Sequence, residues 1–385
     1  MNTSCLDSSI MFRDVSPEKA ITFTRLSVAL NCYWPLPSTA TWFQVLRFKI
    51  FRILSMLSTA ALVFPLLYSM YVHRDDTVIL TKVACFTLAL IHILCQSVFS
   101  IVHHDRIQVL VEEMTEFCTK AETIERCVLQ RYVDKYSTFY GMSASWFYVT
   151  SSIFVVGTLF IDQPFPTDAA YPFAVDYEPV KTVIYLHQTY VFMQCSAMVC
   201  VNMFVALLLL FTAARFEILM EELRVVQNVD MLIECLKKYY HVRSYAQEVV
   251  NVLQYSALYT TVMVTLPIVL CGLNIIGRQP IVIKVQFMFL AGTTLLEVFM
   301  CAWPADTLLE VSEKAMRSVY ESTWYEQSVR MQKIVLLALL PQKPITIHLA
   351  FMVPVLSLQF FCSYIANVFS MFTTLRLVLN EEAKS

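Results

Sequence analysis

Charged residues and glycine are both scarce in this sequence. Only 15% of its 385 residues are charged and only five are glycine, whereas hydrophobic residues make up 57%. A soluble domain carries about 25% charged residues, so the composition indicates a protein embedded in lipid. The formal net charge of -2 supplies neither a basic field for nucleic acid nor an acidic tail. We therefore expect no nucleic-acid partner.

Motifs for catalysis and metal binding are missing as well. The chain has no glycine-rich phosphate loop with its lysine, no Gly-x-Ser-x-Gly and no His-Glu-x-x-His sequence. No Cys-x-x-Cys pair occurs, and the adjacent His103 and His104 have no cysteine nearby. Most of the twelve cysteines lie in apolar stretches, where we expect small buried hydrophobes. The sequence predicts no enzyme, no metal site and no cofactor.

Long apolar stretches are what the sequence has instead. A helix that crosses a bilayer needs about 20 mostly apolar residues. Six stretches near or above that length contain no charge, and a seventh is interrupted only by Glu297. They are Ile53–Val72, Val83–Val102, Phe139–Ile161, Thr182–Ala214, Val249–Gly277 and Pro344–Leu375, with Val285–Ala305 as the seventh. The sequence therefore predicts an all-α membrane protein with seven transmembrane helices.

Several helices are predicted to extend beyond the membrane. At about 1.5 Å per residue, Thr182–Ala214 and Pro344–Leu375 would each be about 50 Å long, against a hydrocarbon core of about 30 Å. Helical spacing of apolar residues also continues through the charged stretches Ile107–Lys135 and Phe216–Gln247. We expect these to form a cytoplasmic layer, with Ile334–Leu340 as a short buried or interfacial helix.

Lysine and arginine are distributed unevenly between the two sides of the predicted membrane. Of the 28, 21 precede the first span or lie in the second-to-third, fourth-to-fifth and sixth-to-seventh connections, and 7 lie on the other side. These residues concentrate in cytoplasmic loops. The amino terminus is therefore predicted to be cytoplasmic and the carboxyl terminus extracellular.

Two other classes of membrane protein fit the sequence less well. A G-protein-coupled receptor has its amino terminus outside, and the acidic-Arg-Tyr triplet and Asn-Pro-x-x-Tyr motif of that class are missing. A secondary transporter more often has paired helix breaks and several charges inside the membrane. Here Glu297 is the single charge inside a predicted span.

The last third of the chain, Val298–Leu379, carries an ordered set of short motifs. They are Cys301–Asp306 (Cys-Ala-Trp-Pro-Ala-Asp), Leu309, Ser312-Glu313, Ala315, Tyr320–Tyr325, Lys333, Leu336-Leu337, Gln342–Pro344, Pro354, Ser357-Leu358, Phe361 and Ser370–Arg376 (Ser-Met-Phe-Thr-Thr-Leu-Arg). Their order and spacing, together with the predicted topology, resemble the insect odorant receptor family. The sequence departs from that pattern at Met371, where an aromatic residue is usual.

The resemblance implies an odorant-gated, non-selective cation channel in which four subunits surround a pore. This chain is similar to the odorant-binding subunit, because its fourth-to-fifth connection lacks the long insertion of the shared co-receptor. The implied partners are that co-receptor, in a heterotetramer, a volatile odorant and the lipid bilayer. The implied location is the plasma membrane of a sensory-neuron dendrite. A gustatory-type channel of the same superfamily and a metabotropic receptor remain the alternatives.

By resemblance, the odorant site lies in the outer half of the membrane among the second, third, fourth and sixth helices. Volatile ligands offer few hydrogen bonds, so apolar and aromatic contacts with one or two polar anchors are expected. The residues on one face of each outer half are Val83, Phe86 and Thr87; Ser143, Trp146 and Thr150; Gln188 and Phe192; and Phe287 and Leu290. Core packing or lipid contact is the alternative for each of them.

The last helix carries polar residues at three- and four-residue spacing, namely Gln359, Ser363, Asn367, Ser370 and Thr374. A polar stripe on an otherwise apolar helix needs water or a partner, which favours a pore lining. Packing of small polar residues against a neighbouring helix is the alternative. Alignment with the family places the extracellular gate at Thr374 and Val378.

Glu297 is a candidate gating or conduction charge, because an intramembrane charge is costly and usually functional. His92 and His187 are interpreted as structural, hydrogen-bonded histidines. The predictions divide the chain into a cytoplasmic segment (1–52), six helices with the pocket and cytoplasmic extensions (53–318), a cytoplasmic anchor helix (319–343), and the pore helix with a short extracellular tail (344–385).

Overall fold

The computed structural model describes residues 15–160, 163–175, 177–277, 280–340, 342–348 and 355–382, and in the last range not the side chains of 375 and 378–382. These residues form helices and contain no strand. The α-helices are α1 (Pro17–Ser27), α2 (Trp42–Val72), α3 (Thr77–Val102), α4 (His104–Lys120), α5 (Thr123–Gly157), α6 (Val180–Val199), α7 (Val201–Arg224), α8 (Val229–Ile276), α9 (Ile281–Lys314), α10 (Val329–Ala338) and α11 (Leu358–Glu382). The all-α prediction is confirmed.

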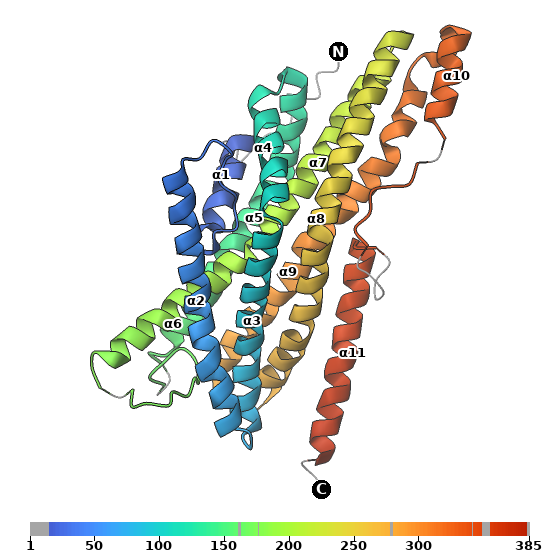
Figure 1. Cartoon of the computed structure of the whole chain (residues 1–385). Helices are drawn as coiled ribbons and strands as arrows, with labels where there is room; N and C mark the ends of the chain where they lie inside the picture. Colours follow the sequence, from blue (N-terminus) through green and yellow to red (C-terminus); the bar gives the residue numbers. More distant parts are fainter. Residues whose placement is uncertain are drawn as a thin grey trace.

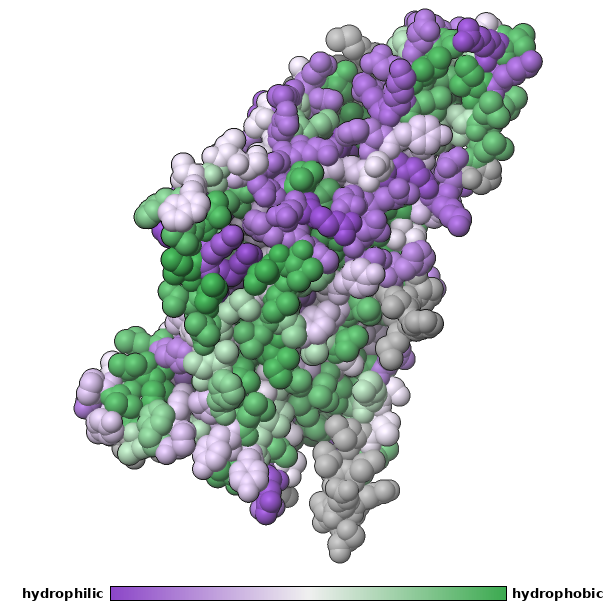
Figure 2. Space-filling view, in the orientation of Figure 1, coloured by the Kyte–Doolittle hydropathy of each residue, from purple (hydrophilic) through white to green (hydrophobic). Residues whose placement is uncertain are grey.

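Five helical stretches in the described residues are long and apolar enough to cross a membrane. They are α2, α3, α6 with α7, α8, and α9 with the 3-10 turn that follows it. The more polar α5 and α11 are not among them. Figure 1 shows the long helices side by side in an elongated bundle. Figure 2 shows hydrophilic residues gathered at the end that carries α4 and α10, and a largely hydrophobic surface below them.

The axis of the bundle is α7, which packs against α5, α8 and α9. In its most apolar stretch, 89% of the residues of α6 and α7 are buried within the chain, against 33–39% in the other four stretches. Phe204, Leu208 and Leu209 are completely buried. A helix can be surrounded by other helices in this way only when it is apolar on nearly every side. The sequence supplies this by placing no charge between Lys181 and Arg215.

Beyond the apolar part, turns connect α4 to α5 and α7 to α8; α7 packs against α8, whereas α1 packs against both α4 and α5. One turn, between α4 and α5, is followed by a capping box in which Glu122 and Glu125 satisfy the free N–H groups of α5. The other, between α7 and α8, ends at Asn228, whose side chain accepts a hydrogen bond from the Met231 N–H at 2.8 Å. The charged stretches 107–135 and 216–247 are therefore helical as predicted, but each contains a turn.

A buried arginine of α7 contacts both α4 and α8. Arg215 of α7 forms an ion pair with Glu113 of α4, and its side chain is only 8% exposed. Its guanidinium also lies 5.1 Å from the ring centroids of Phe117 and Tyr245, on α4 and α8. The paired charge and the aromatic faces together compensate for the burial of the guanidinium. Arg215 therefore joins three helices at a single point.

The cysteines behave mainly as small apolar residues. Seven of the eleven in the described residues are buried, and all eleven are free thiols. Burial raises the pKa of the Cys118 thiol in α4 to about 12, so this thiol stays protonated at neutral pH. Cys95 and Cys362 are the exposed members of the described set.

The prediction of one long helix over Pro344–Leu375 is wrong. Residues 342–348 and 355–357 are not helical, and α11 begins only at Leu358. The predicted helix contains Pro354 in its interior, where proline removes a main-chain hydrogen bond and disfavours helix at the preceding residue. Other groups bind this backbone: the Ile345 N–H donates to Ser312 Oγ at 3.0 Å, and the Leu358 N–H donates to Asp306 Oδ1 at 3.3 Å.

The region predicted as one anchor helix, 319–343, consists of shorter pieces. Residues Ala315–Glu321 and Trp324–Glu326 form 3-10 turns, and α10 follows them. Ser328 caps α10 by accepting a hydrogen bond from the Met331 N–H at 3.3 Å. Met331 and Val335 are its buried residues, so α10 rests on the bundle through one face, as predicted for the apolar run 334–340.

Candidate functional site

A cavity of ≈ 90 Å³ lies inside the bundle between α3, α5, α6, α8 and α9. Phe86 lies nine residues from the start of α3 and Glu297 sixteen from the start of α9. At 1.5 Å per residue, the cavity therefore lies about 14 Å to about 24 Å along these helices, measured from the end of the bundle where α3 and α9 begin. Its lining residues are Cys85, Phe86, Leu88, Ala89, His92, Ile93, Phe147, Thr150, Ser151, Phe154, Phe192, Cys195, Ser196, Met198, Val199, Met263, Val264, Pro267, Leu290, Thr293, Thr294 and Glu297.

Three phenylalanines from three helices form the upper wall of the cavity. The ring centroid of Phe86 lies 5.2 Å from that of Phe154 and 5.5 Å from that of Phe192, both edge to face. Phe154 and Phe192 stack on each other at 5.5 Å. Phe287 packs behind them, 6.2 Å from Phe154. Aromatic packing of this kind gives a rigid, apolar surface suited to a small organic ligand.

The hydroxyl groups in the wall donate their hydrogen bonds to the protein itself. Ser151 Oγ and Ser196 Oγ lie 2.6 Å apart, and each is also within hydrogen-bond distance of a main-chain carbonyl, that of Phe192 at 2.8 Å and that of Phe147 at 2.9 Å. Thr294 Oγ1 donates to the Ala291 carbonyl at 2.8 Å. The protons of these hydroxyls are therefore used within the protein, and only lone pairs are left to interact with a ligand.

One face of α11 is polar and exposed in the single chain. Gln359, Ser363, Asn367, Ser370 and Thr374 are all exposed. The opposite face is buried, where Tyr364 and Val368 pack against Val264 and Ile268 of α8 and Val298 of α9. Thr374 Oγ1 donates to the Ser370 carbonyl at 2.9 Å. The predicted stripe is thus a continuous surface, whereas the side chain of Val378 lies outside the described residues.

Comparisons with known proteins support a single family. Residues 76–373 match the family model described as 7tm Odorant receptor. The chain belongs to the odorant receptor family. Its structure is similar to that of the insect olfactory receptor OR5 from Machilis hrabei, with a TM-score of 0.74, 14% identity, and coverage of 93% of this chain and 97% of that one.

A second structure of OR5 from Machilis hrabei, in complex with eugenol, gives a TM-score of 0.76 at 14% identity and covers 94% of this chain and 98% of that one. A sequence comparison with curated proteins found no match. At this identity the structural likeness establishes the fold of the odorant receptor, and its pocket has to be described from its own residues.

Four of the ten residues predicted for the ligand site line the cavity of the receptor. They are Phe86, Thr150, Phe192 and Leu290, one from each of the four predicted helices. Phe287 lies directly behind the aromatic wall. Trp146 does not line the cavity but contacts a residue that does: its Nε1 donates to Thr293 Oγ1 at 3.2 Å, and its ring stacks on Phe289 at 4.5 Å.

The remaining four predicted residues pack elsewhere. Val83 and Thr87 are buried outside the cavity, and Thr87 Oγ1 lies 3.9 Å from Met70 Sδ of α2. Ser143 is buried and donates to the Phe139 carbonyl at 2.9 Å. Gln188 holds the loop that follows α5, as described below. None of the four is among the residues that line the cavity.

Other cavity residues were missed; some lie one helical turn from a predicted residue, and three lie on α8, where no site residue was predicted. Phe154 follows Thr150 by four residues, and Ala89 and Ile93 continue the face of Phe86. His92, interpreted as structural, lines the cavity and also contacts Thr260 Oγ1 through Nε2 at 3.3 Å. Glu297, predicted as a gating charge, lines the same cavity.

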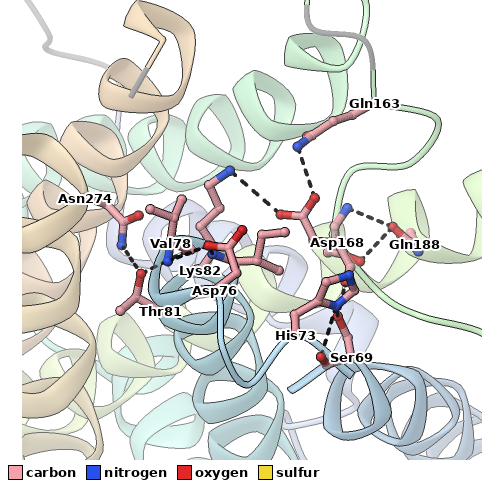
Figure 3. Close-up of polar contacts among 12 residues, drawn as sticks. Ser69, His73, Asp76, Val78, Thr81, Lys82, Gln163, Asp168, Gln188 and Asn274 are labelled. Atoms are coloured by element: carbon pink, nitrogen blue, oxygen red, sulfur yellow. Dashed lines mark hydrogen bonds and ion pairs between the residues drawn. The ribbon is translucent and has the colours of Figure 1, made fainter. Parts of the chain in front are cut away.

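The loop after α5 is held against the neighbouring helices by polar contacts of Gln163, Asp168, Lys82 and Gln188 (Figure 3). Gln188 Oε1 accepts hydrogen bonds from the N–H and hydroxyl of Thr167, both at 3.0 Å, and Nε2 donates to the Tyr171 hydroxyl at 3.1 Å. Lys82 of α3 forms an ion pair with Asp168 at 3.8 Å. The loop is therefore tied to α3 and α6 by buried polar groups.

Lys82 is the buried partner of that ion pair, with a side chain 9% exposed against 24% for Asp168. Changing Asp168 to asparagine should leave Lys82 as an unpaired buried charge. We expect the purified receptor to lose about 1–3 kcal/mol of stability, below the ~3–5 kcal/mol of a fully buried pair. Thermal unfolding in detergent measures this loss.

The double change Lys82→Met with Asp168→Asn serves as the control. It removes the charge together with its partner, so it should restore much of the lost stability. An Asp168→Asn receptor as stable as the unsubstituted one would show that the ion pair does not hold the loop.

Proposed function

We propose that this odorant receptor is the odorant-binding subunit of a ligand-gated, non-selective cation channel in the plasma membrane of a sensory-neuron dendrite. It crosses the membrane seven times, with a cytoplasmic amino terminus and an extracellular carboxyl terminus. It assembles with the insect odorant receptor co-receptor into a heterotetramer, in which α11 lines the pore. An odorant bound in the cavity opens that pore.

The observation that carries the proposal is that the cavity and α11 share two helices. Val264 of α8 lines the cavity and also packs in the cluster that holds Tyr364 and Val368 of α11. Thr265 Oγ1 lies 3.3 Å from the Tyr364 hydroxyl. On α9, Phe299 lies 5.1 Å from Phe361. A ligand that displaces α8 or α9 therefore acts directly on the buried face of α11.

The exposed face of α11 supports the pore assignment. Exposed polar residues on a membrane helix require water or polar partners. A ring of such helices around a water-filled axis satisfies that requirement. Exposed apolar residues beside the stripe, Phe369 at 67% and Met371 at 50%, supply surface for contact with neighbouring subunits.

Whole-cell recording tests the mechanism. Cells that express this chain with the co-receptor, with G-protein signalling blocked, should give a cation current when a panel of volatiles is applied. Cells that express this chain alone should give none. Current that disappears when G-protein signalling is blocked would favour the metabotropic alternative, and an epitope at the carboxyl terminus that antibodies reach only after permeabilisation would contradict the topology.

A further inference from the structure

Glu297 is a buried carboxyl group without a complete set of partners. It is 5% exposed, and its Oε2 is buried with no hydrogen-bond partner in the described structure. It lies on the cavity wall, in the part furthest from the start of α9. Among the described residues, no lysine or arginine lines the cavity with it. A buried polar atom that faces a cavity and lacks a partner points to a ligand.

We propose that the cavity binds a small volatile amine whose nitrogen pairs with the Glu297 carboxyl group. This inference rests on the proposed function and specifies the chemical class of the odorant. An isolated buried carboxylate is very costly, so Glu297 is the neutral acid before the amine binds. A neutral amine enters, its nitrogen lone pair takes the carboxyl proton, and an ammonium–carboxylate pair forms. No net charge enters the cavity.

The rest of the wall favours a ligand that donates hydrogen bonds. The protons of the Ser151, Ser196 and Thr294 hydroxyls are used in the Ser151–Ser196 hydrogen bond and in bonds to main-chain carbonyls, so lone pairs are what these groups offer a ligand. An ammonium group supplies three donors, whereas an ester or ketone supplies none. An ester or ketone could accept one hydrogen bond from the protonated Glu297 carboxyl, but it has no donor for the lone pairs of these hydroxyls.

The aromatic wall suits the remainder of an amine. Phe86, Phe154 and Phe192 enclose the end of the cavity opposite Glu297. Their rings pack against an apolar tail, and ring faces also attract cations. The ≈ 90 Å³ volume restricts the tail to a short alkyl chain, because benzene already occupies a cavity of about 150 Å³. A straight-chain amine of about four carbons is therefore the matched probe.

The test compares butylamine with 1-butanol, which has the same chain length but no basic nitrogen. Full-length receptor expressed with the co-receptor should respond to the amine at a concentration about tenfold lower or more. The variant Glu297→Gln keeps the size of the side chain and removes the acid. We expect it to raise the half-maximal amine concentration by about tenfold or more and to change that of the alcohol less than about threefold.

The matched control is Glu310→Gln on the same helix, which removes an exposed carboxylate that pairs with Lys314. It should leave both responses unchanged. Equal potency of butylamine and 1-butanol on the unsubstituted receptor would overturn the inference, and so would a Glu297→Gln receptor that keeps its amine response. The first of these outcomes needs no variant, so the proposal stays testable even when Glu297→Gln does not reach the surface.

Binding without current separates this inference from the proposed function. The purified full-length receptor should be stabilised against heat more by butylamine than by 1-butanol, because a ligand that binds the folded state raises its stability. Amine-selective stabilisation without any evoked current would support the amine site and contradict the channel function. Evoked current with no amine selectivity in either measurement would support the channel function and contradict the amine site.

Discussion

Replacing Ala89 with phenylalanine should strongly weaken the response to odorants that activate the unsubstituted receptor. Ala89 lies on α3 and lines the cavity of ≈ 90 Å³. A benzyl group at this position would occupy the space that the ligand uses, because α3 is held between α2 and α8 and cannot withdraw. Overfilling a packed interior costs about 1–3 kcal/mol, so the half-maximal odorant concentration should rise roughly 5- to 100-fold.

The control for added bulk is Val98→Phe, further along the same helix, where the side chain is 50% exposed on the outside of the bundle. It adds an aromatic ring to α3 without entering the cavity, so the odorant response should be retained. Dose–response recordings at matched surface expression measure both variants. An unaltered response in Ala89→Phe would place the odorant site outside this cavity.

Replacing Asn367 with lysine should strongly reduce the cation current while the receptor still reaches the surface. Asn367 lies in the middle of the exposed polar face of α11. At a separation of about 8 Å and an effective dielectric constant of about 20, a lysine would repel a passing cation by about 2 kcal/mol. That energy corresponds to a roughly thirtyfold fall in local cation occupancy.

Asn367→Asp separates a pore lining from simple helix packing. A carboxylate attracts cations, so this variant should keep the current and shift the reversal potential toward higher cation selectivity. If Asn367 instead packs against a neighbouring helix, both charges should disrupt assembly, and both variants should lose current and surface expression together. Reversal potentials and surface labelling of the two variants decide between these outcomes.

The helices were predictable because their lengths and composition are dictated by the lipid. A charge-free stretch such as Val83–Val102 has to become a helix that satisfies its own backbone. The same criterion ignores proline, so it extended the last helix back across Pro354 to Pro344, and the structure is not helical at Pro344. The sequence did contain signals for the later start at Leu358, because Pro354 and the capping residue Ser357 both precede it.

The rotation of each helix was harder to predict than its existence. When both faces of a helix are apolar, periodicity does not distinguish the face that lines a cavity from the face that packs on a neighbour. Phe86 faces the cavity, while Thr87, the next residue, contacts α2. Gln188 illustrates a second limit, because its partners Thr167 and Tyr171 belong to a loop whose path only the folded chain determines.

The burial of α7 has a consequence for how the receptor responds to different membranes. The outward side chains of α2, such as Leu54 at 58% and Phe64 at 72% exposure, meet the acyl chains directly. A thicker or thinner bilayer therefore tilts or strains the peripheral helices first. The axial helix, touched by protein on nearly every side, is insulated from such changes. Sensitivity to lipid composition should thus be a property of peripheral helices such as α2, while α7 keeps the same geometry from one cell type to another.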